Sequence, residues 1–275
     1  MLGAIIGDIV GSIYEFNNIK TKEFAFFTDK MEYTDDSILT LATADWLLHG
    51  GKSSYYYYRY ATENPYPMGS YGTMFVQWIH KARRGIVLPY NSCGNGSAMR
   101  VAPVGWAFSS KSEILSAAKA SAECTHNHPE GIKGAQATAL CIFMARTGVT
   151  KNDIRLCIET EFGYSLSMSI DDLRSRYSWH GVDGNGNGGI CQDSVPQAIM
   201  CALQAEDFED AIRNAISIGG DSDTIGCITG GIAEALYGIP QVIYDKGMTY
   251  IKPEFQSVVK AFESKYGNNL YNENK

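Results

Sequence analysis

Residues 33–51 read YTDDSILTLATADWLLHGG, and their apolar pattern decides the fold class. Four apolar residues recur at i, i+3, i+4 and i+8, the spacing of one helix face: Ile38, Leu41, Ala42 and Trp46. The pair Gly50-Gly51 follows and predicts the end of this helix. The stretch therefore predicts an amphipathic helix that begins directly after two adjacent aspartates.

The same helical spacing recurs along the rest of the chain. We expect further helices over residues 75–82, 129–147, 195–205, 208–218, 224–237 and 253–265. Ser112 is expected to cap one more helix, which contains Ile114 and Ala118. No series of alternating strands occurs at regular spacing. The sequence predicts an all-α, multi-helix bundle that forms a single domain over residues 1–275.

Composition excludes several classes of protein. The chain has 275 residues, of which 45% are hydrophobic and 19% are charged, so it is long and apolar enough to fold around its own core. No apolar run is long enough to cross a membrane, and the apolar N-terminus lacks the basic region of a signal peptide. The net charge of −7 argues against a nucleic-acid partner, except as a modified substrate. Seven scattered cysteines without a C-x-x-C pair favour reduced thiols and a cytoplasmic protein.

Two aspartate-rich motifs stand at predicted helix starts. Thr34-Asp35-Asp36 precedes one helix, and Asp221-Ser222-Asp223-Thr224 precedes another after a pair of glycines. Carboxylate and hydroxyl oxygens are the ligands that Mg²⁺ prefers, and two such motifs together have enough ligands for two ions. Taken singly, each motif is equally typical of helix capping.

Two glycine loops, residues 69–72 and 94–97, lead into predicted helices, and Ser97 is expected to cap the second of these helices. Backbone amides at such positions bind anions, and Arg100 would add a guanidinium, although either loop can simply be a turn. Cys124, His126 and His128 lack a fourth ligand for zinc, so His126 is better interpreted as a ligand-contacting or structural residue. Asp8 is expected to be a buried structural carboxylate, and residues 165–189 a loop or flap.

Read in order, these motifs resemble the ADP-ribosylglycohydrolase family. The similarity covers residues 3–8 with Glu15, residues 34–37, residues 94–100, Thr125-His126 and residues 219–224. The family pattern often has threonine at the place of Ser37, which keeps a hydroxyl there.

The resemblance implies an orthogonal α-helical bundle and a hydrolase with two Mg²⁺ or Mn²⁺ ions. Metal ligands implied by it are Thr34, Asp35, Asp36, Asp221, Asp223 and Thr224. Substrate-binding residues implied by it are Gly69, Ser70, Tyr71, Gly72, Gly94, Asn95, Gly96, Ser97, Met99, Arg100 and His126. Glu15, Asp35 and Asp36 are the catalytic candidates, with Glu15 beside the distal ribose and Glu15 or Asp36 taking the proton of the attacking water.

The implied reaction is hydrolysis of the bond between ADP-ribose and an acceptor such as an arginine side chain of a mono-ADP-ribosylated protein. Serine, a nucleic-acid base or an acetyl group are alternative acceptors, because all share the ADP-ribose half. Two other functions remain as hypotheses: a non-catalytic ADP-ribose-binding protein, and a metal hydrolase of another ADP-ribose derivative or nucleotide.

Overall fold

The computed structural model describes residues 1–267, so the last eight residues of the predicted 1–275 domain, residues 268–275, lie outside the described part. The all-α, single-domain bundle is confirmed. Its helices are α1 (Leu2–Gly11), α2 (Asp35–His49), α3 (Ser53–Glu63), α4 (Thr73–Ala82), α5 (Gly96–Met99), α6 (Ala102–Ala107), α7 (Lys111–Glu123), α8 (Pro129–Arg146), α9 (Lys151–Phe162), α10 (Ile170–Arg176), α11 (Cys191–Leu203), α12 (Phe208–Ser217), α13 (Ser222–Tyr237), α14 (Gln241–Met248) and α15 (Pro253–Tyr266).

Strands are confined, within residues 1–267, to one short hairpin in the predicted 165–189 loop. Its strands are β1 (Tyr177–Ser178) and β2 (Gly181–Val182), paired antiparallel. Helix α10 occupies the start of the same segment, so the expected flap is a helix followed by a hairpin and a loop.

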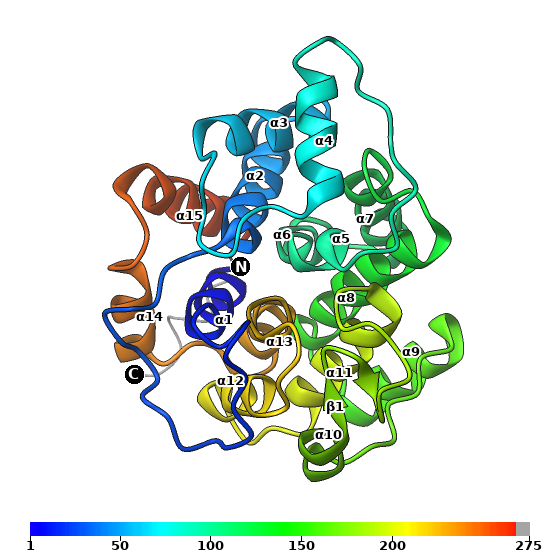
Figure 1. Cartoon of the computed structure of the whole chain (residues 1–275), viewed down its shortest axis with the longest axis vertical. Coiled ribbons are helices and arrows are strands. Elements are labelled where there is room, and N and C mark those ends of the chain that lie inside the picture. The colour runs from blue at the N-terminus through cyan, green and yellow to red at the C-terminus, as the bar shows by residue number, and fades with distance from the viewer. Residues whose placement is uncertain (268–275) are drawn as a thin grey trace.

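The centre of the bundle is the contact between α1 and α13, which lie side by side in Figure 1. Every residue of α1 is buried. A Cβ at Gly7 would lie 1.9 Å from the carbonyl oxygen of Gly226, and a Cβ at Gly230 would lie 2.0 Å from that of Gly3. The two backbones therefore touch, and only glycine fits at these positions.

Two predicted helix starts are corrected. Ser110, not Ser112, caps α7: its side chain accepts from the amide of Glu113, whose carboxylate returns a bond to the Ser110 amide. This capping box gives a hydrogen-bond partner to two backbone amides at the start of the helix. A cap at Ser112 would leave both amides without that partner. Helix α11 begins at Cys191 rather than 195, with Pro196 in its first turns.

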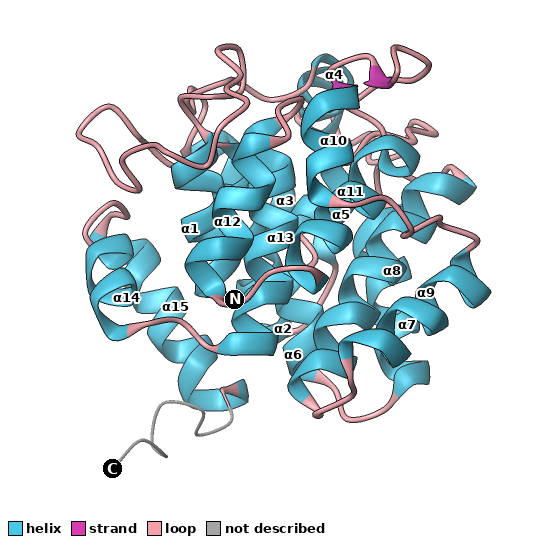
Figure 2. Cartoon of the chain, turned by 90° about the horizontal axis from the view of Figure 1, so that it is seen from below, coloured by secondary structure: helices cyan, strands magenta, loops and turns pink. Residues whose placement is uncertain are grey.

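The arrangement of loops decides where a ligand can enter. Figure 2 shows the longer loops gathered on one side of the helical body. Helices α2 and α13 both begin with acidic residues that line one cavity. Among the described residues, no helix is both long and apolar enough to cross a membrane.

Candidate functional site

A cavity of about 560 Å³ brings most of the predicted site residues together. Its volume lies in the range typical of small-molecule sites. The predicted residues that line it are Glu15, Asp35, Asp36, Gly69, Ser70, Tyr71, Gly72, Gly94, Asn95, Gly96, Met99, Arg100, His126, Asp221, Asp223 and Thr224. The two predicted residues that do not line it are Thr34 and Ser97, which lie buried behind the wall.

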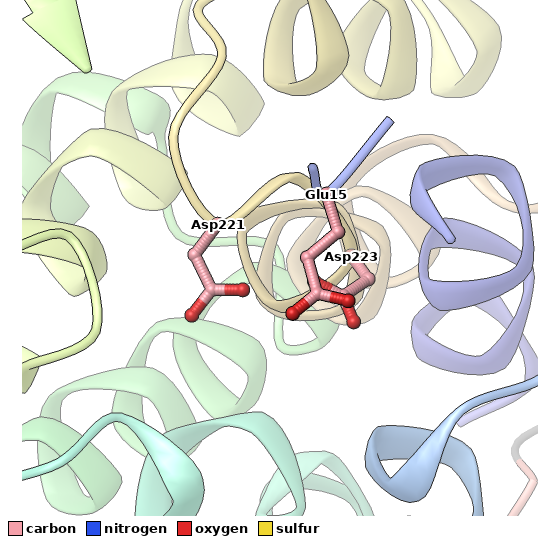
Figure 3. A group of neighbouring side chains, drawn as sticks. All are labelled: Glu15, Asp221 and Asp223. Atoms are coloured by element: carbon pink, nitrogen blue, oxygen red, sulfur yellow. The ribbon is translucent and has the colours of Figure 1, made fainter. Parts of the chain in front are cut away.

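Three carboxylates meet at one end of the cavity. Oxygen atoms of Glu15, Asp221 and Asp223 lie within 4.8 Å of one another, and Figure 3 shows the three groups gathered around a common space. Glu15 belongs to the chain that leaves α1, whereas Asp221 and Asp223 stand at the start of α13. The close contact of α1 with α13 therefore sets the distance between these groups.

Asp8 holds the second acidic motif in place from inside the bundle. Its carboxylate accepts from the Thr34 amide at 2.9 Å, from the Thr34 hydroxyl at 2.7 Å and from the Ser37 amide at 3.1 Å. The Ser37 hydroxyl donates a further bond to it. The Thr34 oxygen in turn accepts from the Asp36 amide and caps α2. Asp8 is thus the buried structural carboxylate expected from the sequence, and it fixes where Asp35 and Asp36 lie.

The acidic end is electrostatically unfavourable without a cation. Burial raises the pKa of Asp36 and Asp223 well above the usual value, and repulsion from neighbouring aspartates raises both further. Burial, with added repulsion from Asp223 and Asp8, raises the pKa of Glu15 to about 8. No basic side chain lowers the pKa of any of these three groups. Each carboxylate is therefore held in a place that disfavours its own charge.

The same residues fit hard divalent cations. Oδ2 of Asp36 and Oδ1 of Asp223 are buried, and neither has a hydrogen-bond partner among the described residues. The Thr34 hydroxyl donates to Asp8 and accepts from Asp36, which leaves one lone pair of its oxygen free. An all-oxygen set of orphaned carboxylates is the ligand type of Mg²⁺ and Mn²⁺.

A second part of the cavity wall lies around His126 and the 94–97 loop, and Asn95 of this loop joins it to the acidic end by donating to Asp221 Oδ2 at 2.7 Å. Burial and the neighbouring Arg100 lower the pKa of His126 well below its usual value, so its ring is uncharged. Nδ1 of His126 lies 2.8 Å from the Thr125 hydroxyl, while Nε2 lies 3.0 Å from where a Cβ at Gly96 would be. His126 therefore packs closely on the 94–97 loop, and a side chain at Gly96 would push against its ring.

Arg100 is mainly an internal support. Its side chain is fully buried, its guanidinium lies 4.0 Å above the ring of Tyr57, and it donates to Ser121 O and Thr125 Oγ1. Two further nitrogens of the guanidinium have no partner among the described residues. A buried arginine with free donors beside the cavity still suits an anionic ligand.

Two backbone amides of the 94–97 loop, which was expected to bind an anion, already donate hydrogen bonds within the protein. The Asn95 amide donates to Gly189 O and the Gly94 amide to Ser92 Oγ, so both bond within the protein. Ser97 is not a helix cap: it lies inside α5 and donates to Gly131 O at 2.6 Å. In the other loop, Ser70 has a φ of 71°, a strained conformation for serine that is typical of functional sites.

A family model described as ADP-ribosylglycohydrolase matches residues 1–262. The chain belongs to the ADP-ribosylglycohydrolase family. Its orthogonal helical bundle is the fold expected from the motifs, and a solved structure titled "ADP-ribosylglycohydrolase-related protein complex" shares it with a TM-score of 0.70. That structure is 23% identical and covers 96% of this chain and 97% of its own.

Curated relatives in the family are hydrolases. The ADP-ribosylhydrolase ARH3 of Mus musculus is 29% identical over 88% of this chain and 84% of its own length. The ADP-ribosylarginine hydrolase Tri1 of Pseudomonas putida is 26% identical over 87% of this chain and 70% of its own. This member of the family is accordingly an ADP-ribosyl hydrolase.

The glycohydrolase site includes supports that the motifs do not reveal. Asn18 donates to Glu15 O at 3.1 Å and Gly220 O at 2.9 Å, and accepts from the Gly220 amide at 2.8 Å. Trp179, from the 165–189 segment, donates to Glu15 O at 2.9 Å and stacks on the exposed ring of Phe16. Asn18 thus joins Glu15 to the turn that carries Asp221.

Gly69 was expected beside the substrate, yet its nearest neighbour is a carboxylate. Its φ is +76°, and a Cβ there would lie 2.7 Å from Oε2 of Glu15. The 69–72 loop therefore packs directly on Glu15 and helps to fix that carboxylate in the cavity.

Proposed function

We propose that this chain is a metal-dependent glycohydrolase that releases ADP-ribose from a mono-ADP-ribosylated protein, with arginine as the acceptor. The observation that carries the proposal is a group of mutually repelling carboxylates in a ligand-sized cavity, where Asp36 and Asp223 each keep one buried oxygen without a partner among the described residues. Similarity to the relative named an ADP-ribosylarginine hydrolase supports arginine as the acceptor.

Two Mg²⁺ or Mn²⁺ ions are the cofactors in this proposal. Their ligands are Thr34, Asp35, Asp36, Asp221, Asp223 and Thr224. Support comes from the free oxygens of Asp36 and Asp223 and from the hydroxyl of Thr224 at the cavity wall. The chemistry that such ions supply when bound is Lewis-acid polarisation and a lowered pKa of a neighbouring water.

Proton transfer falls to a carboxylate at the same end. Glu15 lies against Asp223, whose repulsion helps to raise the pKa of Glu15, and bound cations would offset that repulsion and leave the carboxylate free to accept the proton of the attacking water. Asp36 is the second candidate, since one of its oxygens has no partner among the described residues. Cleavage at C1″ of the distal ribose passes through a cation-like state, which these carboxylates favour by their charge.

The remaining cavity residues hold the ADP-ribose half. His126, the 94–97 loop and Arg100 face the anionic and adenosine parts, and residues 69–72 position the distal ribose beside Glu15. Ser97 acts through its bond to Gly131 rather than by touching the ligand. A cytoplasmic location completes the proposal, supported by seven free cysteines, four of them buried.

The test is release of ADP-ribose from an ADP-ribosyl-arginine protein, followed by chromatography, with Mg²⁺, Mn²⁺ or EDTA. Intact ADP-ribose that appears with metal and disappears with EDTA is the expected result. Release of AMP or phosphate instead would indicate a diphosphate hydrolase. Binding of ADP-ribose without release from any acceptor would indicate a non-catalytic binder.

A matched pair of variants controls this assay. Asp35→Asn removes a proposed ligand, whereas Asp29→Asn makes the same change at an exposed position that does not line the cavity. We expect loss of release only in Asp35→Asn, with unchanged helical circular dichroism in both. Full activity of Asp35→Asn would contradict the proposed metal site.

A further inference from the structure

One long segment of this acidic chain carries no acidic residue. Residues 64–112 contain neither aspartate nor glutamate, although the chain has 30 of them and a net charge of −7. The segment includes α4 and the loop that follows it. It is therefore a basic region on a protein whose remaining surface is strongly acidic.

The most exposed part of this segment is residues 80–89, which we call the α4 tip. All seven residues from 83 to 89 are exposed. Among them, Leu88 is 68% exposed, Ile86 48% and Val87 46%. Three consecutive exposed aliphatic side chains are an unusual feature of a protein surface and mark a site of interaction.

The cations of the α4 tip have no partners. Lys81, Arg83 and Arg84 make no side-chain hydrogen bond, ion pair or ring contact with any described residue. Every other arginine of the described chain donates at least one side-chain hydrogen bond, and these are Arg59, Arg100, Arg146, Arg155, Arg174, Arg176 and Arg213. The two unpaired arginines thus lie next to the exposed aliphatic residues.

The α4 tip connects to the cavity at both of its ends. Helix α4 begins with Thr73, Met74 and Phe75, which line the cavity, and rises away from it at the upper edge of Figure 1. At 1.5 Å per residue, its ten residues place the tip about 15 Å from that wall. After the tip the chain returns to the cavity at Tyr90.

The exposed surface continues towards Glu15. Tyr66 is 94% exposed in the loop before α4, and the same loop packs on Glu15 at Gly69. A polypeptide whose modified side chain enters the cavity beside Glu15 therefore has a path along α4 to the tip.

We propose that the α4 tip is a docking surface for the polypeptide that carries ADP-ribose, and that it selects an acidic segment with apolar side chains. Charge complementarity indicates that the partner segment is acidic. The tip is a basic surface on a chain that otherwise repels acidic partners. Aliphatic rather than aromatic side chains favour a protein over a single-stranded nucleic acid, whose bases stack on aromatic rings. The proposal rests on the proposed glycohydrolase function and names the substrate class of that site.

The test compares three substrates that share one ADP-ribosylated arginine. Free ADP-ribosyl-arginine has no flanking chain, an acidic peptide carries Asp, Glu and Leu on both sides, and a basic peptide carries Lys and Ser there. Arg83→Glu with Arg84→Glu should raise KM for the acidic peptide about tenfold at low salt and leave its kcat unchanged. KM for free ADP-ribosyl-arginine should not change.

A charge-matched variant controls for net charge. Lys30→Glu with Lys260→Glu makes the same change at two exposed lysines that, among the described residues, have no side-chain hydrogen bond or ion pair. We expect it to leave all three KM values within twofold. A second variant, Ile86→Ser with Leu88→Ser, should raise KM for the acidic peptide several-fold even at high salt, because apolar contacts are not screened.

A binding measurement keeps this proposal separate from the catalytic one. Fluorescence anisotropy of the acidic peptide without ADP-ribose reports docking whether or not any substrate is cleaved. Equal KM changes for all three substrates, or equal binding of acidic and basic peptides, would overturn the docking proposal. Binding to phosphatidylserine vesicles but not to the acidic peptide, abolished by Arg83→Glu with Arg84→Glu, would also overturn it, because the tip would then be a membrane contact. Absence of cleavage with intact peptide binding would overturn only the glycohydrolase function.

Discussion

The acidic end of the cavity and the part around His126, which we call the His126 end, are built in opposite ways, although Asn95 joins them through its bond to Asp221. At the acidic end, Asp36 and Asp223 keep buried oxygens without partners, and burial raises the pKa of each group. At the His126 end, the imidazole is neutral and bonded to Thr125, and Arg100 donates to Ser121 and Thr125. The aspartates keep partnerless oxygens that suit a cation, whereas the His126 part keeps two partnerless Arg100 nitrogens that suit an anion.

This difference separates two functions that share one pocket. Orphaned buried carboxylates are costly, and a folded protein keeps them only where a ligand or ion compensates the charge. The His126 part has the opposite use, because the free donors of the cationic Arg100 suit an anionic ligand. We therefore expect metal binding and ADP-ribose binding to respond to different substitutions.

The largest effect is expected from Asp223→Asn. It removes the charge of a proposed metal ligand, and substitution of residues that only hydrogen-bond to metal ligands already lowers metal affinity or activity about 10–100-fold. We expect activity to fall by at least about 100-fold and metal affinity, measured by calorimetry, to fall with it. Affinity of the metal-free protein for ADP-ribose should stay within a few-fold. If that affinity collapsed equally, the two ends would not be separable.

Asp223→Asn should also stabilise the metal-free protein. The substitution removes repulsion from Asp221 and Asp8 that raises the pKa of Asp223. In EDTA, the variant should therefore unfold at a higher temperature than the wild type. Added Mn²⁺ should raise the unfolding temperature of the variant by less than it raises that of the wild type.

A second prediction concerns pH. The folded state holds the proton of Glu15 up to about pH 8, whereas an unperturbed glutamate loses it near 4.5. Between these values the folded state binds more protons, so stability of the metal-free protein falls as pH rises through the window. We expect a loss of about 2 kcal/mol, allowing for partial exposure of Glu15 to water. Glu15→Gln should flatten this dependence in urea unfolding, and an unchanged slope would contradict the repulsive arrangement.

A third prediction tests the link from Glu15 to the Asp221 turn. Asn18→Ala removes the bonds to Glu15 O and Gly220, so both carboxylates lose a common support. We expect kcat to fall about tenfold with metal affinity reduced, while KM changes little. Asn17→Ala is the matched control, because Asn17 is exposed and makes no side-chain bond to the described residues. Equal effects of the two variants would rule out a positioning role for Asn18.

The smallest effect is expected at the His126 end. His126→Ala removes the ring that packs on the 94–97 loop and changes no carboxylate of the acidic end. Affinity for ADP-ribose should fall several-fold, with no change in metal affinity by calorimetry. A loss of metal affinity in this variant would show that the ends are coupled.

Sequence alone predicted the local parts of this site well. Residues 35–49 and 222–237 each carry their own helical spacing and their own acidic start, so both helices and their aspartates were evident. The buried role of Asp8 followed from a charge within an apolar helix. Each of these signals lies within about four turns of one helix.

The supports of the site were not predictable in the same way. Asn18 and Gly220 are 202 positions apart, and Trp179 lies 164 positions from Glu15. No local pattern marks such partners, since an exposed asparagine and a loop tryptophan are ordinary residues. Ser97 and Ser112 were misassigned as caps for the related reason that the choice among nearby hydroxyls depends on how the chain enters the helix.

The glycine contact between α1 and α13 also has a consequence for how the protein is made. Gly7 leaves the ribosome long before its partner Gly226, because most of the described chain lies between them. Contacts of such sequence separation form late. The carboxylates that repel one another are therefore kept apart throughout synthesis, and a nascent chain that ends before α13 has neither the central helix pair nor the acidic site. Truncations that remove α13 should therefore yield chains that aggregate, rather than folded enzymes with reduced activity.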